Sequence, residues 1–196
     1  MTTHQPSDTP PAPPLTFRSG PSDPIRFADG VGTHVAVTIA APASVVWPIV
    51  TDLDTPAPHS DEYSGGTWID AGPALGARFT GRNANSTLGE WDMISHIDRY
   101  EPERVFGWAT NDVDNPGATW CFVLEPNQTG TDLRFELRLG PGPSGLTSII
   151  DARPELETRI LMGRLRQLHD SMQRTVEGIR QIAESNADPD PATPTS

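Results

Sequence analysis

The sequence predicts an α+β domain in which a curved antiparallel sheet of about seven strands wraps around one long C-terminal helix. Short β-type runs recur between residues 67 and 140, and short turn-like segments separate them. A single apolar stripe at helical spacing follows Pro154. Strands joined by short links form an antiparallel meander, and a long amphipathic helix needs a large apolar partner. The meander is the candidate partner.

The chain is expected to enter this sheet through a strand and a short helix. Residues 34–39 alternate apolar and other side chains, as in a half-buried strand. Pro42 suits a first helical turn, and a helix is expected from there to about Asp54. Pro48 is tolerable only near the start of that helix, because proline has no backbone donor. Residues 55–66 are rich in Pro and Gly and are expected to form turns.

The later strands are expected where runs rich in β-branched or aromatic residues end at Gly, Asn or Pro. They are Thr67–Asp70, Ala77–Asn83, Leu88–Arg99, Arg104–Thr110, Thr119–Glu125 and Thr131–Leu139. A sheet with one covered and one wet face shows alternation. Trp120, Phe122 and Leu124 alternate in this way, which places them on one face.

A short helix is expected at Leu146–Ala152, and the long helix runs from Pro154 to about Ser185. About 30 helical residues span about 45 Å. The stripe steps by three or four residues along one face. It consists of Leu161, Leu165, Leu168, Met172, Val176, Ile179 and Ala183.

Composition divides the chain into a folded middle and two tails. Residues 1–29 are rich in Pro and are expected to form a disordered tail, and residues 186–196 a second one. Residues 30–185 have the size of one domain.

The composition also indicates the cellular compartment and excludes some classes of binding partner. Cys121 is the only cysteine, and neither a signal peptide nor a transmembrane stretch is evident, so a cytoplasmic protein is expected. The net charge is −12 and Lys is absent. Such a chain repels phosphate backbones and anionic membranes, so neither nucleic acid binding nor membrane insertion is expected. The sequence does not indicate an oligomeric state.

Three stretches carry a resemblance to a known family. They are VAVTIAAPASVVWPIVTDLD at 35–54, GARFTGRN at 76–83 with the strand around Trp91, and RVFGWAT at 104–110 with ATWCFVLEPNQTGTDLRFEL at 118–137. The chain resembles the polyketide cyclase/dehydrase-like branch of the START-related (SRPBCC) superfamily. This resemblance implies a helix-grip fold with a deep cavity between sheet and helix. It does not imply one reaction, because fold is not function.

A cavity is expected where the curled sheet and the helix diverge, and inward side chains would line it. Trp offers a large apolar area with one donor, and Met adapts to irregular shapes, so these walls favour aromatic or lipid-like ligands. The candidate ligand-binding residues are Phe79, Trp91, Met93, Phe106, Trp108, Trp120, Phe122, Phe135, Leu165, Leu168, His169 and Met172.

Catalytic candidates are weaker. His169 and His96 could exchange a proton near neutral pH, and Arg82 could clamp a carbonyl or an anion. His96 is out of phase with Trp91, so it is expected on the opposite face. No polar residue is found clearly in phase with the aromatic faces. No metal-binding spacing and no nucleotide-binding or nucleophile motif occurs, so neither a metal nor a cofactor is expected.

The sequence leaves three hypotheses for the function of this protein. The first is binding of a hydrophobic or aromatic small molecule, lipid-like or polyketide-like, in the internal cavity. The second is a polyketide cyclase, aromatase or dehydratase, which needs the same cavity and a positioned acid–base group. The third is a co-chaperone-like interaction domain, which would show an exposed apolar patch. The inward aromatic residues favour the first two, and the first is preferred.

Overall fold

The computed structural model describes residues 25–86 and 89–187. The strands are β1 (Gly32–Ile39), β2 (Tyr63–Trp68), β3 (Arg78–Asn85), β4 (Gly89–Glu101), β5 (Val105–Thr110), β6 (Ala118–Pro126) and β7 (Thr131–Leu139). The α-helices are α1 (Ala43–Val50), α2 (Gly145–Ala152) and α3 (Glu157–Ala187). Three short 3-10 helices are η1 (Phe27–Asp29), η2 (Ala57–His59) and η3 (Pro154–Leu156).

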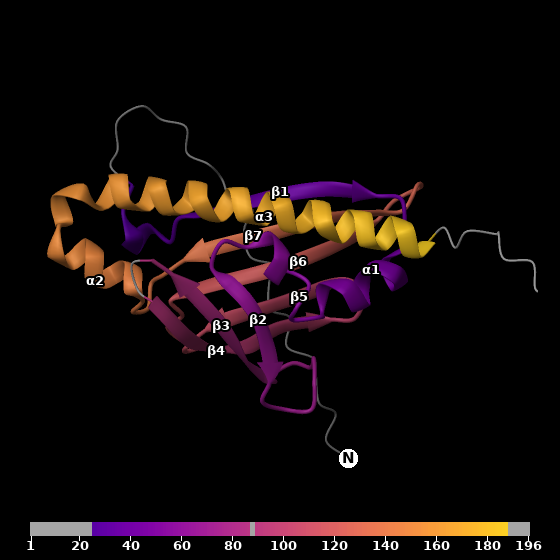
Figure 1. The fold of residues 1–196 in the computed structure, drawn as a ribbon, viewed down its shortest axis with the longest axis horizontal. Coiled ribbons are helices and arrows are strands. Elements are labelled where there is room, and N and C mark those ends of the chain that lie inside the picture. Colours follow the sequence, from indigo (N-terminus) through magenta and orange to yellow (C-terminus); the bar gives the residue numbers. More distant parts are fainter. Residues whose placement is uncertain (1–24, 87–88, 188–196) are drawn as a thin grey trace, which may run out of the picture.

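The strands form one seven-stranded sheet in the order β1-β7-β6-β5-β4-β3-β2, and all neighbouring pairs are antiparallel. The sheet is therefore a meander from β2 to β7, and β1 joins its edge beside β7. α3 lies across the curved sheet, with α2 at the N-terminal end of α3 and α1 near its C-terminal half (Figure 1). The expected fold class, a helix-grip sheet around a long C-terminal helix, is confirmed.

Alternation along the strands separates an inner face from an outer one. On β7, Leu133, Phe135 and Leu137 are buried toward the helix, and the residues between them are more exposed. The seven residues of the expected stripe on α3 are all buried as well. α3 packs chiefly on β1 and α1. The core therefore lies between the inner face of the sheet and one face of α3.

Two elements differ from the sequence expectation for local reasons. α1 ends at Val50, four residues before the expected Asp54. Pro48 lies within it, and the Thr51 hydroxyl donates to the Trp47 carbonyl at 2.9 Å, which closes the last turn. β2 begins at Tyr63, inside the segment expected to be turns, because its glycines take part in the strand.

The segment before β2 is fastened to α3. The His59 imidazole lies directly on Gly178, where no Cβ would fit. Arg174 of α3 donates to the His59 carbonyl oxygen at 3.0 Å and pairs with Asp61 at 2.9 Å. Since β2 is the edge strand farthest from β1, these contacts hold the far side of the sheet against the helix.

Most of the two expected tails, 1–29 and 186–196, lies outside the described residues. Within the first of them, Phe27 of η1 is buried, and its backbone N–H donates to Glu157 at 2.7 Å. None of the described helices combines the length and the apolar character needed to span a bilayer.

Candidate functional site

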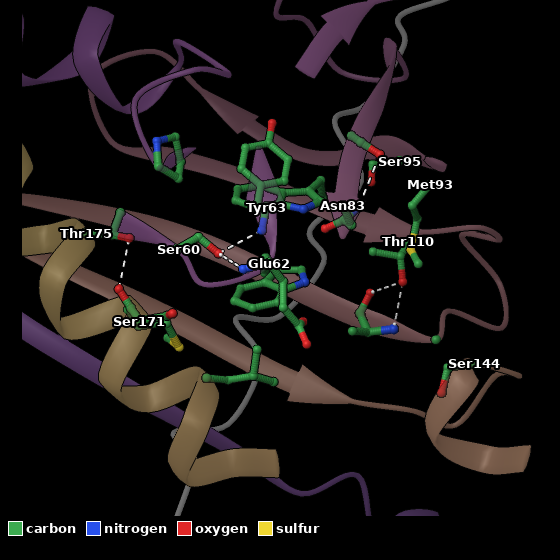
Figure 2. A pocket seen from close by; sticks show the side chains of 18 of the residues that line it. Ser60, Glu62, Tyr63, Asn83, Met93, Ser95, Thr110, Ser144, Ser171 and Thr175 are labelled. Atoms are coloured by element: carbon green, nitrogen blue, oxygen red, sulfur yellow. Dashed lines mark hydrogen bonds between the residues drawn. The ribbon is translucent and has the colours of Figure 1, made fainter. Parts of the chain in front are cut away.

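A cavity of about 500 Å³ lies between the inner face of the sheet and α3. Its wall is mostly apolar and comes from the segment between α1 and β2, from β3 to β7, from α3 and from the start of α2. Figure 2 shows polar side chains placed around this space at several points. The volume falls in the range typical of small-molecule sites.

The aromatic part of the wall is a continuous group of rings. Trp108 and Trp120 face each other across β5 and β6, with ring centroids 6.2 Å apart and planes 9° apart. Phe122 and Phe135 stack at 4.0 Å across β6 and β7. Trp108 also lies 6.1 Å from Phe79, so the rings extend over five strands. Such a surface offers large contact area to a flat or apolar guest.

Most of the expected ligand-binding residues line this cavity. They are Phe79, Trp91, Met93, Phe106, Trp108, Trp120, Phe122, Phe135, Leu168 and Met172. Leu165 is buried on α3 but does not line the cavity. His169 is also outside the lining, and its Nδ1 lies 2.9 Å from the Thr33 hydroxyl of β1. Its position at the edge of the helix stripe explains this, because that edge faces β1 rather than the open space.

The other two catalytic candidates are on the opposite side of the sheet. His96 is the cross-strand neighbour of Arg78, and its spacing along β4 places it on the face opposite to the inner residues Trp91 and Met93. Arg82 donates to the Thr67 hydroxyl at 3.1 Å and lies 4.0 Å from Asp54. Neither residue lines the cavity.

Polar residues do occur in phase with the aromatic faces, contrary to the sequence interpretation. Ser95 continues the inward alternation of Trp91 and Met93 on β4, and Thr110 continues that of Trp108 on β5. Ser95 is 3% exposed, and Thr110 is 7% exposed. Their period-two spacing from the aromatic residues is the sequence signal that could have identified them.

The largest polar group at the cavity is an ion pair that the sequence did not indicate. Glu62, the residue before β2, accepts from both terminal nitrogens of Arg164 on α3, at 2.8 and 2.7 Å. Asn85 and Gln167 donate to the same carboxylate at 2.9 and 3.4 Å. Glu62 and Arg164 are 102 positions apart, so only the fold could reveal the pair.

These contacts set the ionisation of the groups around the cavity. Burial alone would raise the pKa of Glu62, but the hydrogen bonds and charge of Arg164 hold that pKa below its usual value. Burial raises the pKa of Tyr63, whose hydroxyl donates to the Leu53 carbonyl at 2.8 Å. Glu62 is therefore an anion and Tyr63 a neutral phenol near neutral pH. Among the described residues, no group of three or more His, Cys, Asp or Glu side chains is placed so that it could hold a metal ion.

Comparison with known proteins supports the fold and gives the family. None of the curated proteins compared with the chain matches it. Among solved structures, the polyketide cyclase-like protein Cgl2372 of Corynebacterium glutamicum is 27% identical, with a TM-score of 0.59 over 79% of this chain and 92% of that one. TTHA0849 of Thermus thermophilus is 14% identical, with a TM-score of 0.55 over 81% of this chain and 100% of that one.

The di-domain ARO/CYC protein StfQ, from the steffimycin biosynthetic pathway, is 13% identical with a TM-score of 0.61. The alignment covers 82% of this chain and 53% of StfQ, and at this identity it shows a shared fold alone. A family model for polyketide cyclase/dehydrase and lipid transport proteins matches residues 31–177. That match spans β1 to α3, including every wall of the cavity, and the chain therefore belongs to the polyketide cyclase/dehydrase and lipid transport family.

Proposed function

We propose that this protein binds a hydrophobic or aromatic small molecule, lipid-like or polyketide-like, in the cavity between the sheet and α3. The observation that carries the proposal is the continuous aromatic wall around a space of about 500 Å³. Protein interiors normally pack with few voids larger than a water molecule. A space this large, walled by rings, is therefore better explained as a binding site than as a packing defect.

The partial exposure of two tryptophan rings also supports a binding site. Phe106 and Phe122 are fully buried, as expected of core residues. Trp108 and Trp120, in contrast, are only partly buried although both point inward. Their remaining surface faces the cavity, where burial by an apolar guest is worth about 25 cal/mol for each Å² removed from water.

Binding is favoured over catalysis by the placement of the titratable groups. A general acid or base has to reach the reacting atoms and needs a pKa near the working pH. His169 and His96 do not line the cavity, and the Glu62 carboxylate, which does, is occupied by Arg164 and has a lowered pKa. The described lining residues are therefore better suited to binding a ligand by shape and contact area than to transferring a proton.

The test is native mass spectrometry of the freshly purified protein, followed by titration with N-phenyl-1-naphthylamine, an uncharged dye that fluoresces in apolar surroundings. We expect either a bound apolar adduct or saturable dye binding with one molecule per chain. An adduct that can be extracted also reveals the chemical class of the natural ligand. A protein without an adduct that also fails to bind the dye would refute the proposal.

A further inference from the structure

Two hydroxyl groups at the cavity have no hydrogen-bonding partner among the described residues. The Ser144 oxygen, at the start of α2, is shielded from solvent and makes no hydrogen bond. The Ser95 hydroxyl on β4 also makes no hydrogen bond within the described residues, but its oxygen is not among those shielded from solvent, although the residue as a whole is 3% exposed. A buried hydroxyl without a partner costs about 1–3 kcal/mol. Such groups are rare in native proteins and call for a specific explanation.

Two other cavity hydroxyls, those of Thr110 and Thr175, are already engaged within the protein. Thr110 donates to the Ala118 carbonyl at 3.2 Å and accepts from the Ala118 N–H at 2.9 Å. Thr175 of α3 donates to the Ser171 carbonyl at 3.0 Å. For these two threonines, the protein backbone therefore supplies the hydrogen-bond partners. Ser95 and Ser144 stand apart from that pattern.

The two serines lie on the same side of the cavity. Ser95 is the cross-strand neighbour of Thr110. A Cβ at Gly117 would lie 3.4 Å from both the Thr110 hydroxyl and the Ser144 Cβ, so Thr110 links the two serines in space. Figure 2 shows Ser95, Thr110 and Ser144 together on one side, while Ser171 and Thr175 lie across from them on α3.

Helix capping does not account for the Ser144 hydroxyl. Thr147 closes the start of α2, since its hydroxyl accepts from the Ser144 N–H at 2.9 Å and donates to the Ser144 carbonyl at 2.6 Å. The Ser144 side chain has the position of a capping-box residue toward the Thr147 N–H, yet its oxygen makes no hydrogen bond. This hydroxyl therefore has no partner within the described residues, and its residue lies in the cavity wall.

We propose that Ser95 and Ser144 determine ligand specificity by hydrogen bonding to oxygen atoms along one edge of the bound molecule. This inference rests on the proposed function. The ligand it implies carries hydroxyl or carbonyl groups at that edge, while its apolar body lies against Trp108 and Trp120. A few placed polar groups in an apolar pocket fix orientation in this way. A site built to bond an oxygen rejects an analogue without one, because the protein hydroxyls then stay unpaired.

The experiment compares naphthalene with 1,3-dihydroxynaphthalene, which share one ring system and differ in their oxygens. Each displaces N-phenyl-1-naphthylamine from the wild type and from Ser95→Ala, Ser144→Ala and the double variant. We expect the wild type to prefer the dihydroxy compound. Each single variant should reduce that preference about fivefold to tenfold, the worth of one hydrogen bond. Naphthalene and the dye should bind all variants alike, which also shows that the variants are folded.

Thr175→Val is the matched control, because it removes a cavity hydroxyl that is already engaged. Its preference for the dihydroxy compound should equal that of the wild type. An unchanged preference in both serine variants, an equal loss in the Thr175 variant, or no preference in the wild type would each overturn the assignment while leaving the binding function intact. Failure of the wild type to bind the dye, in protein that also carries no bound adduct, would instead overturn the binding function, and the assignment with it.

Discussion

Replacing Trp108 with alanine tests whether the aromatic wall binds the ligand. The Trp108 ring lies within 6.2 Å of the centroids of five other aromatic rings, so it is at the centre of the wall. These rings are Phe79, Phe106, Trp120, Phe122 and Phe135. It is also partly exposed to the cavity. The substitution therefore removes a face on which the guest rests.

The expected loss follows from the apolar area that the guest no longer covers. Burial of a large apolar side chain is worth about 1.5–3 kcal/mol, and a ligand covers only the part of Trp108 that faces the cavity. We therefore expect a loss of about 1–3 kcal/mol, which corresponds to a Kd about 5-fold to 150-fold higher. The variant should also unfold more easily, because its neighbours lose ring contacts.

Equilibrium titration with N-phenyl-1-naphthylamine measures the change, and urea unfolding of the unliganded protein measures the stability separately. Trp68→Ala is the matched control. Trp68 packs against Phe79 at 5.6 Å but does not line the cavity, so this variant should lose stability and keep its affinity within about twofold. A folded Trp108→Ala protein with wild-type affinity would refute the assignment of the aromatic wall.

Three further outcomes follow from contacts outside the aromatic wall. Gly178→Ala should destabilise the protein by about 1–3 kcal/mol in urea unfolding, because the new methyl group overlaps the His59 imidazole, and adding His59→Ala should recover part of the loss. Glu62→Gln should weaken the acid dependence of stability. Because the pKa of Glu62 is lowered in the native state, its contribution to the free energy of unfolding is present above its unfolded-state pKa and is lost as the pH falls through its native pKa. Plots of the free energy of unfolding against pH for the wild type and the variant should therefore converge in acid. Parallel plots would show that Arg164 does not hold the carboxylate. Burial raises the pKa of the Cys121 thiol to about 12, so a disulfide exchange reagent at pH 8 should modify it only in urea, and rapid reaction of the native protein would contradict this burial.

Patterns local in the sequence predicted much of the fold and part of the site. The period-two alternation on β7 and the seven-residue stripe on α3 depend only on near neighbours, and both were confirmed as buried faces. The same kind of alternation indicated Trp108 and Trp120 as inward residues. Strand and helix periods fix which side chains share a face, so a covered face can be recognised before its partner is known.

Where the sequence reasoning failed, the deciding contacts join distant parts of the chain. His169 was expected in the cavity, but β1 packs beside it and Thr33 binds its imidazole. The Glu62–Arg164 pair depends on how the segment before β2 meets α3, which no local pattern encodes.

The sequence by itself determined the class of fold, the faces of its strands and the stripe of its long helix, because hydrophobic periodicity is a property of neighbouring residues. Only the tertiary structure decided how far the sheet stands from the helix, which hydroxyls remain unpaired and which charges meet. Cavity volume and the pairing of Glu62 with Arg164 result from the relative placement of elements a hundred residues apart, and that placement is set by packing of the whole core.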